Sequence, residues 1–572
     1  MTARPWTGAI SGGAILLFLV LAAHQAAKPL HLDNMDFPAV AEATAQSGKP
    51  IYYRGEENKL HSGLYHPPLY IYLLAGWFRL FGGGPAQARM FGALCALLQG
   101  WLALRILGDL LGEERVREWR WLFWPLFLLN PYTLQTSAIP DIDSTVYGPL
   151  LLLVAWAAIR IGWRDGLWRQ DAPSWREIAL VALALTAALW AKLTTVCLLF
   201  PFLFLFLAPR LGWKKAVAVT AAISTAGLAG FFLTYRLYGA LTGLDIAYTF
   251  QFLGASVLGP GRLLSFRSNF LIMAPFMLRW TGLLPWLSVA VLLAAAARVW
   301  WRTRDPRALY AFWLLSLAAG SVVYYCGQVR AFGDAPFKYA FVFWSLIAGA
   351  PALLVAWLQP RLPRALGLAG AAVFLAGLWV GAVDVQDLLL RRGGVYPQAL
   401  SLWVPAGLAV AGLIAWIAGP RLRSAGVALL AGALLLHVGI QTGIAAYQSR
   451  VEYSTTYDYG QSGLKQTADF IAARTTEQEI ISSMKDVGFL AKRRYYENYA
   501  ALYDDASAAR LIEAWEAGRV SYIVFTEDIG QDALASKPAL RDWVAENADL
   551  AASFGNYRIY QPKARKNPRD GV

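Results

Sequence analysis

The chain has 572 residues, of which 57% are hydrophobic and only 15% are charged, so it is too long and too apolar for a single soluble domain. The net charge of +14 would suit a nucleic-acid-binding protein, but residues 1–446 carry all of the excess, with 35 basic against 19 acidic side chains. Cys95, Cys197 and Cys326 lie in or beside apolar runs and give neither a metal-binding spacing nor a disulfide framework. These features indicate a polytopic membrane protein whose basic excess marks its cytoplasmic loops.

The first apolar run, TGAISGGAILLFLVLAA, extends from Thr7 to Ala23 and follows Arg4. No A-x-A-like cleavage site follows it cleanly, so we predict an uncleaved membrane span rather than a signal peptide. With the short basic N-terminus inside, this span places Asp33 and Asp36 on the outer side of the membrane.

The segment from His66 to Gly84, HPPLYIYLLAGWFRLFGGG, is nearly apolar enough for a span. It is short, carries Arg79 near its end and is rich in aromatic residues, which is typical of a helix lying in the membrane interface. If it does not cross, the basic loops that follow, beginning with ERVREWR at 114–120, all fall inside; if it crosses, they all fall outside. The positive-inside rule therefore favours an interfacial helix.

The remaining apolar runs bring the prediction to about 13 spans, each suited to roughly 30 Å of hydrocarbon. The predicted spans lie near residues 7–27, 87–108, 120–139, 144–161, 177–191, 193–208, 216–236, 280–299, 308–326, 338–358, 366–383, 401–418 and 425–446. An odd number of spans puts the C-terminus outside, together with the long loops 28–86 and 237–279. The second of these loops holds another candidate interfacial helix at 244–266.

The tail from residue 447 to residue 572 is polar and has a different character. LKQTADFIAAR has helical apolar spacing, and SAARLIEAWEAG ends in Gly518 as a helix would. EIISSM, SYIVFTED and NYRIYQP are β-branched or aromatic runs that predict short strands. We therefore predict two domains, a transmembrane domain over 1–446 and a small outer α/β domain over 447–572.

Carboxylates at the predicted outer surface are the first candidates for chemistry, because ionisable groups at a membrane are unfavourable and usually functional. Asp36 lies at the start of the predicted helix DFPAVAEATAQSG, closed by Gly48, so a capping role is a simple alternative for it. Asp33 lies too early for that cap. Asp141 and Asp143 share a very short outer turn, where they could form turn and cap hydrogen bonds, bind a divalent cation or orient a hydroxyl.

Basic residues at the same predicted level could bind a lipid phosphate. Lys192, between two apolar runs, could instead be a lysine whose stem lies along the bilayer while its ammonium reaches water. The other members of the set are His66 before two prolines, the Lys338-Tyr339 pair, and Arg262 and Arg267 around the apolar LLSF.

Several of these positions form a pattern in a consistent order along the chain. The pattern comprises Asp33, Phe37, Ala41 and Ser47-Gly48 in the first outer loop, His66-Pro67-Pro68-Leu69-Tyr70, Pro131 and Asp143 in the second outer turn, Lys192, and Lys338-Tyr339. In this order the chain resembles the GT-C superfamily of polyprenyl-phosphate-sugar-dependent glycosyltransferases. It is most similar to the branch with the lipid A aminoarabinose transferase and the dolichyl-phosphate-mannose protein mannosyltransferases. It departs from that pattern at Asn34, often Glu in the family, and at His66, where many relatives have Lys.

The resemblance implies an all-α polytopic fold in the plasma (inner) membrane, with the active site and the C-terminal α/β domain on the extracytoplasmic side. It implies transfer of a sugar from a polyprenyl phosphate to an outer glycan, lipid or protein. Such a donor needs no nucleotide loop, and FGGGPAQAR has neither a preceding strand nor a phosphate-binding lysine. The sequence indicates no cofactor with certainty, and a divalent metal ion is left open.

On this interpretation Asp33 is the general base that deprotonates the acceptor hydroxyl. Asp143, with Asp141 in reserve, orients the acceptor or holds a metal ion, for which Asp36 is a further candidate. The leaving phosphate is stabilised by a set of outer side chains. That set comprises Lys192, His66, Lys338, Tyr339, Arg267 and Arg262.

Two other classes of function remain open on the sequence. A secondary transporter or lipid flippase would need ionisable residues at mid-span, and these are scarce here. A structural membrane protein whose tail binds a partner would leave the aspartates and the HPPLY segment unexplained.

Overall fold

A computed structural model describes most of the chain. The described residues are 5–26, 36–50, 66–164, 167–168, 173–194, 196, 199–247, 249–250, 266–328, 335–358, 368–390, 399–450, 463–498, 501, 505–526, 534 and 537–563. The chain divides into two compact units. The first comprises Met1–Ala27, Leu64–Gly82 and Ala86–Thr456, and the second Lys28–Gly63, Gly83–Pro85 and Tyr457–Val572.

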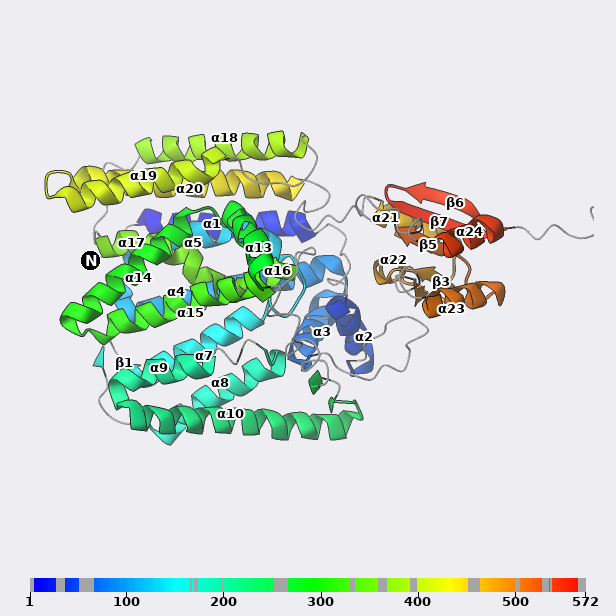
Figure 1. Cartoon of the computed structure of the whole chain (residues 1–572), viewed down its shortest axis with the longest axis horizontal. Coiled ribbons are helices and arrows are strands. Elements are labelled where there is room, and N and C mark those ends of the chain that lie inside the picture. Colours follow the sequence, from blue (N-terminus) through cyan, green and yellow to red (C-terminus); the bar gives the residue numbers. More distant parts are fainter. Residues whose placement is uncertain are drawn as a thin grey trace, which may run out of the picture. The chain divides into compact units, whose positions relative to one another are not determined.

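The first unit is built from helices that lie side by side (Figure 1). They are α1 (Pro5–Ala26), α3 (Leu69–Phe81), α4 (Pro85–Leu111), α5 (Glu113–Leu128), α6 (Pro131–Ser137), α7 (Tyr147–Gly162), α8 (Trp175–Ala191), α9 (Leu199–Leu211), α10 (Trp213–Thr242), α13 (Phe266–Thr281), α14 (Leu284–Thr303), α15 (Pro306–Gln328), α16 (Ala335–Ala340), the 3-10 helix η4 (Phe341–Phe343), α17 (Trp344–Leu358), α18 (Leu368–Leu390), α19 (Ala399–Ala418) and α20 (Arg423–Arg450). Two-residue strands β1 (Trp163–Arg164) and β2 (Leu167–Trp168) pair antiparallel after α7.

Length and composition make this unit a polytopic membrane domain. Seven of its described helices are long and apolar enough to cross a membrane: Thr7–Ala26, Pro85–Leu111, Trp213–Thr242, Leu284–Thr303, Pro306–Gly327, Lys338–Leu358 and Arg423–Tyr447. Shorter apolar helices of 10 to 17 residues accompany them at Leu69–Phe81, Tyr147–Ile161, Leu199–Leu211, Gly370–Val383 and Leu402–Ala418. The predicted fold class, an all-α polytopic membrane protein with a small α/β domain, is confirmed.

Small residues let the long helices approach closely. A Cβ added to Gly381 of α18 would lie 2.2 Å from the carbonyl oxygen of Ile440 in α20, and one added to Gly439 of α20 would lie 2.3 Å from that of Phe374. Lipid chains are as apolar as leucine, so membrane helices associate mainly through such close packing. The contact between α18 and α20 therefore depends on these glycines.

The predicted span at 120–139 is interrupted, which corrects that part of the sequence analysis. α5 ends at Leu128 and a separate helix, α6, begins at Pro131. Asn130 caps α6, since its side-chain oxygen accepts a hydrogen bond of 2.9 Å from the backbone N–H of Tyr132, and proline suits the first helical position. All seven residues of α6, PYTLQTS, are buried although four of them are polar, and the Asn-Pro pair at its start is a local signal for the break.

The segment predicted to lie in the interface forms α3, a helix of 13 residues. At about 1.5 Å per residue it spans roughly 20 Å, less than the ~30 Å of a hydrocarbon core. Tyr70, Leu74 and Phe78 form a buried stripe on α3, while Leu80 is 78% exposed. The second predicted interfacial helix, at 244–266, lies mostly outside the described residues.

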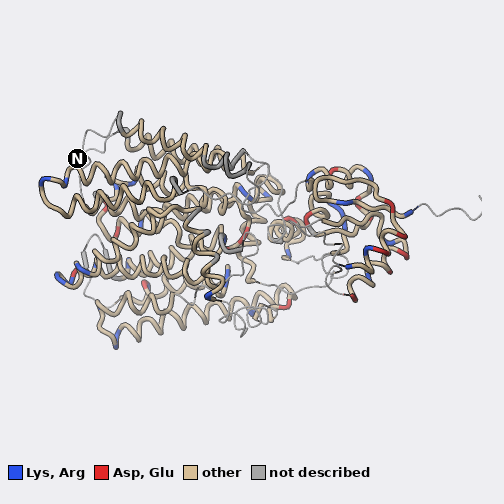
Figure 2. Tube along the Cα trace, turned by 45° about the horizontal axis from the view of Figure 1, so that its top comes forward, with Lys and Arg blue, Asp and Glu red and all other residues tan. Residues whose placement is uncertain are grey.

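Basic side chains gather in the turns at one end of the helical unit. Figure 2 shows them where α14 meets α15 and where α19 meets α20. These turns contain Arg302, Arg304, Arg307, Arg421 and Arg423. This is the end that the positive-inside rule assigns to the cytoplasm.

The second unit contains α2 (Asp36–Ser47), which Gly48 closes as predicted, and a sheet with flanking helices. The sheet order is β4-β3-β5-β7-β6, with β3 parallel to β4 and β5, and β7 antiparallel to β5 and β6. Its elements are α21 (Leu464–Arg474), β3 (Ile480–Ser483), α22 (Lys485–Leu490), β4 (Arg494–Glu497), α23 (Asp505–Glu516), β5 (Ile523–Thr526), α24 (Pro538–Asn547), β6 (Ala548–Phe554) and β7 (Tyr557–Pro562).

Alternation along the strands gives this sheet two apolar faces. Ile523 and Phe525 of β5 belong to a core with α23 and α24, whereas Val524 between them belongs to a core with α21 and α22. Successive side chains of a strand point to opposite faces, so one short strand supplies both cores.

Candidate active site

Four charged side chains form two buried ion pairs at the end of the helical unit opposite the basic turns. Lys192 Nζ lies 2.5 Å from Asp143 Oδ2, and Lys338 Nζ lies 2.8 Å from Asp141 Oδ2. All four side chains are only 1–7% exposed. A charge is buried at an acceptable free energy only when an opposite charge and hydrogen bonds compensate it. The structure thus brings together four residues predicted for the site, although Lys338 and Asp141 are 197 positions apart.

The two aspartates lie in the loop between α6 and α7, and the local sequence builds this loop. Asp141 Oδ1 accepts a hydrogen bond of 3.1 Å from the backbone N–H of Asp143, as in an Asx turn. The hydroxyls of Ser144 and Thr145 donate to the carbonyl oxygens of Ile139 and Asp141, at 2.6 and 2.5 Å. These bonds satisfy buried backbone groups and hold both carboxylates in place.

Lys192 stands at the C-terminal end of α8, where the backbone turns to an extended conformation with φ −161° and ψ 143°. Its carbonyl oxygen accepts a hydrogen bond of 3.2 Å from the Tyr147 hydroxyl. Its ammonium group lies 4.5 Å from the centre of the Tyr339 ring, a distance at which a cation is attracted to the ring face. Lys192 therefore contacts the Asp143 carboxylate and the Tyr339 ring, two side chains that the sequence analysis also selected.

Lys338 and Tyr339 lie in α16, immediately before η4. The amide of Gln99, buried in α4, donates to the carbonyl oxygens of Phe341 and Val342 at 2.8 and 2.9 Å. In a 3-10 turn some carbonyl oxygens lack the backbone N–H donor that they would have in a regular α-helix. Gln99 supplies a donor to two of them. Gln99 thus fixes the short turn that positions Lys338 and Tyr339.

His66 lies close enough to the cluster for both lysines to act on it. Burial and the positive charge of Lys192 lower the pKa of His66 to about 3, with a further contribution from Lys338. The imidazole is therefore neutral near pH 7 and offers one N–H donor and one acceptor rather than a positive charge.

The two carboxylates differ in their electrostatics. Burial acts to raise the pKa of Asp141, but Lys338 and Lys192 outweigh it and hold this pKa below its usual value. For Asp143 burial prevails over Lys192 and raises the pKa to about 6. Oδ1 of Asp143 is buried and has no hydrogen-bond partner among the described residues, which is consistent with a less stabilised carboxylate.

Three residues near the cluster were missed by the sequence analysis. Gln99 is one. Arg89 of α4 donates to the carbonyl oxygens of Ala138 and Ala26, at 3.3 and 3.5 Å, and so connects the aspartate loop to the last residue of α1. Tyr325 of α15 stacks on Tyr339 with ring centres 5.6 Å apart. A polar residue inside an apolar run, as in AQARMFG and ALLQGWL, is the signal that could have identified Arg89 and Gln99.

The other predicted site residues are not part of this cluster as described. Asp33 and Arg262 lie outside the described residues. Asp36 begins α2, which belongs to the second unit. Arg267 is exposed on the first turn of α13.

Metal binding was left open for Asp141, Asp143 and Asp36. In the part of the chain that the structure describes, no group of three or more His, Cys, Asp and Glu side chains is placed to hold a metal ion. Asp141 and Asp143 each have one oxygen on a lysine ammonium, so these oxygens serve ion pairs.

No protein-family model matches the sequence, and no curated protein matches it. Solved structures do match its fold. ArnT from Cupriavidus metallidurans, bound to undecaprenyl phosphate, is similar with a TM-score of 0.61 and 15% identity, over 99% of both chains. The archaeal oligosaccharyltransferase AglB from Archaeoglobus fulgidus, in complex with an inhibitory peptide and a dolichol-phosphate, has a TM-score of 0.51 and 13% identity, over 99% of this chain and 75% of that one. At 13–15% identity these likenesses bear out the fold that the sequence resemblance implies.

Proposed function

We propose that the chain is an integral membrane glycosyltransferase that moves a sugar, a hexose or a pentose, from a polyprenyl-phosphate carrier to an extracytoplasmic acceptor. The observation that carries the proposal is the buried cluster of Lys192, Lys338, Asp141 and Asp143 at one end of an apolar helical unit. Two proteins with this fold were solved with undecaprenyl phosphate and with a dolichol-phosphate, which supports a donor of the same class.

In this proposal the lysines receive the phosphate of the carrier. An ammonium group has three N–H donors, so it can bond a carboxylate and a phosphate oxygen at the same time. As the glycosidic bond breaks, the phosphate gains negative charge, and cations already held in place stabilise that charge without reorganising. Asp141 and Asp143 keep the ammonium groups protonated and oriented, while the neutral His66 offers a hydrogen bond to the leaving group.

The acceptor hydroxyl must lose a proton as it attacks the sugar. Asp33 is our candidate for the general base, because it opens the first-loop pattern of Asp33, Phe37 and Ala41 on which the sequence resemblance rests. General-base help of this kind contributes about 10²–10⁴-fold. Asp143, through its unpartnered Oδ1, is the candidate to orient a sugar or acceptor hydroxyl.

Purified protein in lipid nanodiscs, given radiolabelled polyprenyl-phosphate sugar and a crude envelope extract as acceptor, should release free polyprenyl phosphate. Asp33→Asn should reduce this release by about 10²–10⁴-fold while the protein stays folded. Lys214→Met, at an exposed lysine of α10, is the matched control and should leave the release unchanged. If the lipid-linked sugar crosses the bilayer of a proteoliposome intact and no lipid phosphate is released, the chain is a flippase and the proposal is wrong.

A further inference from the structure

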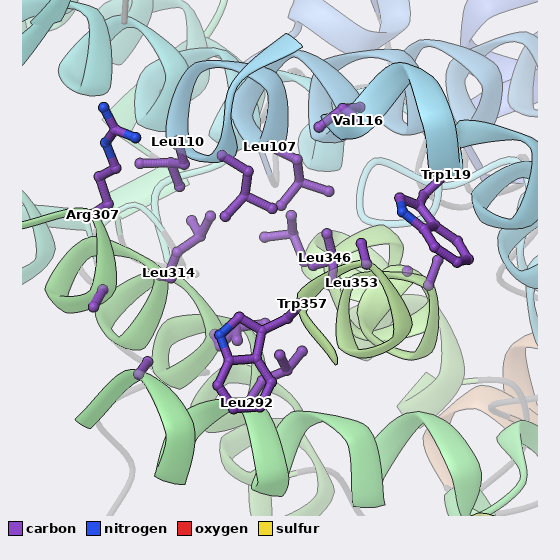
Figure 3. Close-up of a pocket in the computed structure, with 18 of the residues that line it drawn as sticks. Leu107, Leu110, Val116, Trp119, Leu292, Arg307, Leu314, Leu346, Leu353 and Trp357 are labelled. Carbon is purple, nitrogen blue, oxygen red and sulfur yellow. The ribbon is translucent and has the colours of Figure 1, made fainter. Parts of the chain in front are cut away.

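A cavity of about 360 Å³ lies in the half of the helical unit near the basic turns. Its walls are apolar side chains of α4, α5, α14, α15 and α17, which converge on the space in Figure 3. Leu107, Leu314, Leu346 and Leu353 are among them, and Trp357, which is 46% exposed, brings the lining to the protein surface. Pockets of this size accommodate small ligands, and an apolar lining selects a hydrocarbon.

Three charged side chains line the cavity. They are Arg120 of α5, Arg307 at the start of α15, and Asp305 just before it. Asp305 accepts a hydrogen bond of 2.9 Å from the backbone N–H of Arg307, so its carboxylate also serves the first turn of α15. The lining therefore combines an apolar wall with an excess of one positive charge.

Further basic groups surround this lining. Trp357 is 6.3 Å from the Trp416 ring, measured between ring centres, and the guanidinium of Arg423 lies 5.4 Å above Trp416. The guanidinium of Arg304 lies 5.5 Å from the rings of both Trp300 and Trp301. Arginine beside tryptophan is an arrangement found at the level of lipid head groups.

We propose that this cavity binds one anionic phospholipid of the surrounding bilayer, with an acyl chain among the leucines and its phosphate between Arg120 and Arg307. A guanidinium group can donate charge-assisted hydrogen bonds to phosphate oxygens, whereas an uncharged hydrocarbon offers it no acceptor. The tail of a polyprenyl phosphate held at Lys192 and Lys338 would bring no charge here, because those lysines lie at the other end of the unit. The chemistry of the lining therefore favours a phospholipid with its own head group at this end.

The bound lipid would contact the two helices that lead to the lysine cluster. α17 lines the cavity with Leu346, Leu353 and Trp357, and it starts directly after η4 and the Lys338-Tyr339 pair. α15 lines it with Leu314, and near its other end Tyr325 stacks on Tyr339. A ligand that binds only the folded protein raises its stability, so the phospholipid should stabilise this bundle.

Native mass spectrometry of the delipidated full-length protein tests the proposal without measuring sugar transfer. Phosphatidylglycerol should be retained as one copy per protein, and phosphatidylcholine with the same acyl chains should not. The double variant Arg120→Gln/Arg307→Gln should bind phosphatidylglycerol at least about tenfold more weakly, since it loses charge-assisted hydrogen bonds. The matched control Arg176→Gln/Lys214→Gln, at exposed basic residues beside Trp175 and Trp213, should bind as the wild type does.

A second variant tests the cavity itself. Ala296→Phe places a larger side chain in the lining and should weaken phosphatidylglycerol binding, with elution and thermal unfolding confirming a folded protein. Equal retention of the two phospholipids, wild-type binding by either cavity variant, or displacement of phosphatidylglycerol by polyprenyl phosphate would overturn the proposal. Because lipid retention is the readout, an inactive but lipid-binding protein would refute the proposed transferase function alone.

Discussion

The two ends of the helical unit differ in the burial and pairing of their basic side chains. At one end Lys192 and Lys338 are 5% and 4% exposed and are each paired with an aspartate. At the other end the basic side chains are exposed, and several lie against tryptophan rings. These cation–ring pairs are Arg105 with Trp101, Arg160 with Trp156, Arg176 with Trp175, Lys214 with Trp213, Arg304 with Trp300 and Arg423 with Trp416.

The difference follows from solvation. An exposed cation keeps its water or a lipid head group, so its ion pairs and ring contacts are worth little in stability. A buried cation loses its water, and removing its partner leaves an uncompensated charge. The buried pairs therefore suit a preorganised reaction site, whereas the exposed set suits orientation in the membrane and lipid contact.

The largest expected effect is at the buried end. Lys192→Met should destabilise the protein by about 3–5 kcal/mol near pH 7, because Asp143 is left buried without the ammonium group that compensates its charge. The double variant Asp143→Leu/Lys192→Met, which removes both charges, should recover most of that stability and still fail to transfer sugar. Thermal unfolding and lipid-phosphate release measure the two properties separately. If the double variant is as unstable as Lys192→Met, the ion pair is not the source of the loss.

The next effect concerns the support of the lysine cluster. Gln99→Leu should destabilise the protein by about 1–3 kcal/mol, since two buried carbonyl groups of η4 lose their donor. Transfer should fall as well, because η4 directly follows Lys338 and Tyr339. Thr234→Val, at an exposed polar residue of α10, is a control that should leave transfer unchanged. Unimpaired transfer in Gln99→Leu would show that η4 needs no support from α4.

A pH series should isolate Asp143. Its pKa of about 6 in the folded protein is above the ordinary value of 3.8, so the folded state holds the proton more tightly than the unfolded state. This group therefore adds stability below about pH 4, and the contribution is lost as the pH rises through about 6. Between pH 7 and pH 5 the wild type should gain on the order of 1 kcal/mol relative to Asp143→Asn. A constant difference in unfolding between the two proteins would contradict the raised pKa.

The smallest effect is expected at the exposed end. Arg304→Gln should change the free energy of unfolding by less than about 1 kcal/mol, because an exposed cation–ring contact contributes little. Chemical denaturation in detergent would measure this change. A loss comparable to that of Lys192→Met would remove the contrast between the two ends.

Much of the helical unit could be predicted from the sequence, because a hydrocarbon solvent makes long apolar runs unambiguous. Each predicted span overlaps a helix, yet the break at Asn130 in the 120–139 span was missed, although the Asn-Pro pair and the polar residues of PYTLQTS give a local signal for it. In the tail, β3, β5 and β7 match the predicted strands. The strands β4, RYYE, and β6, ADLAASF, were not predicted, because an edge position has one exposed side and a weak apolar pattern.

The sequence by itself determined that this chain is a membrane protein. It also determined which loops are basic and which polar residues lie at the ends of apolar runs. Periodicity and hydropathy are local properties, so they indicate the structure of a segment whatever that segment packs against. Only the tertiary structure decided that Lys192 pairs with Asp143 and Lys338 with Asp141, that Gln99 supports the turn that follows Lys338, and that His66 is neutral. Pairing and burial depend on groups far apart in the chain, and no local pattern records which of them meet.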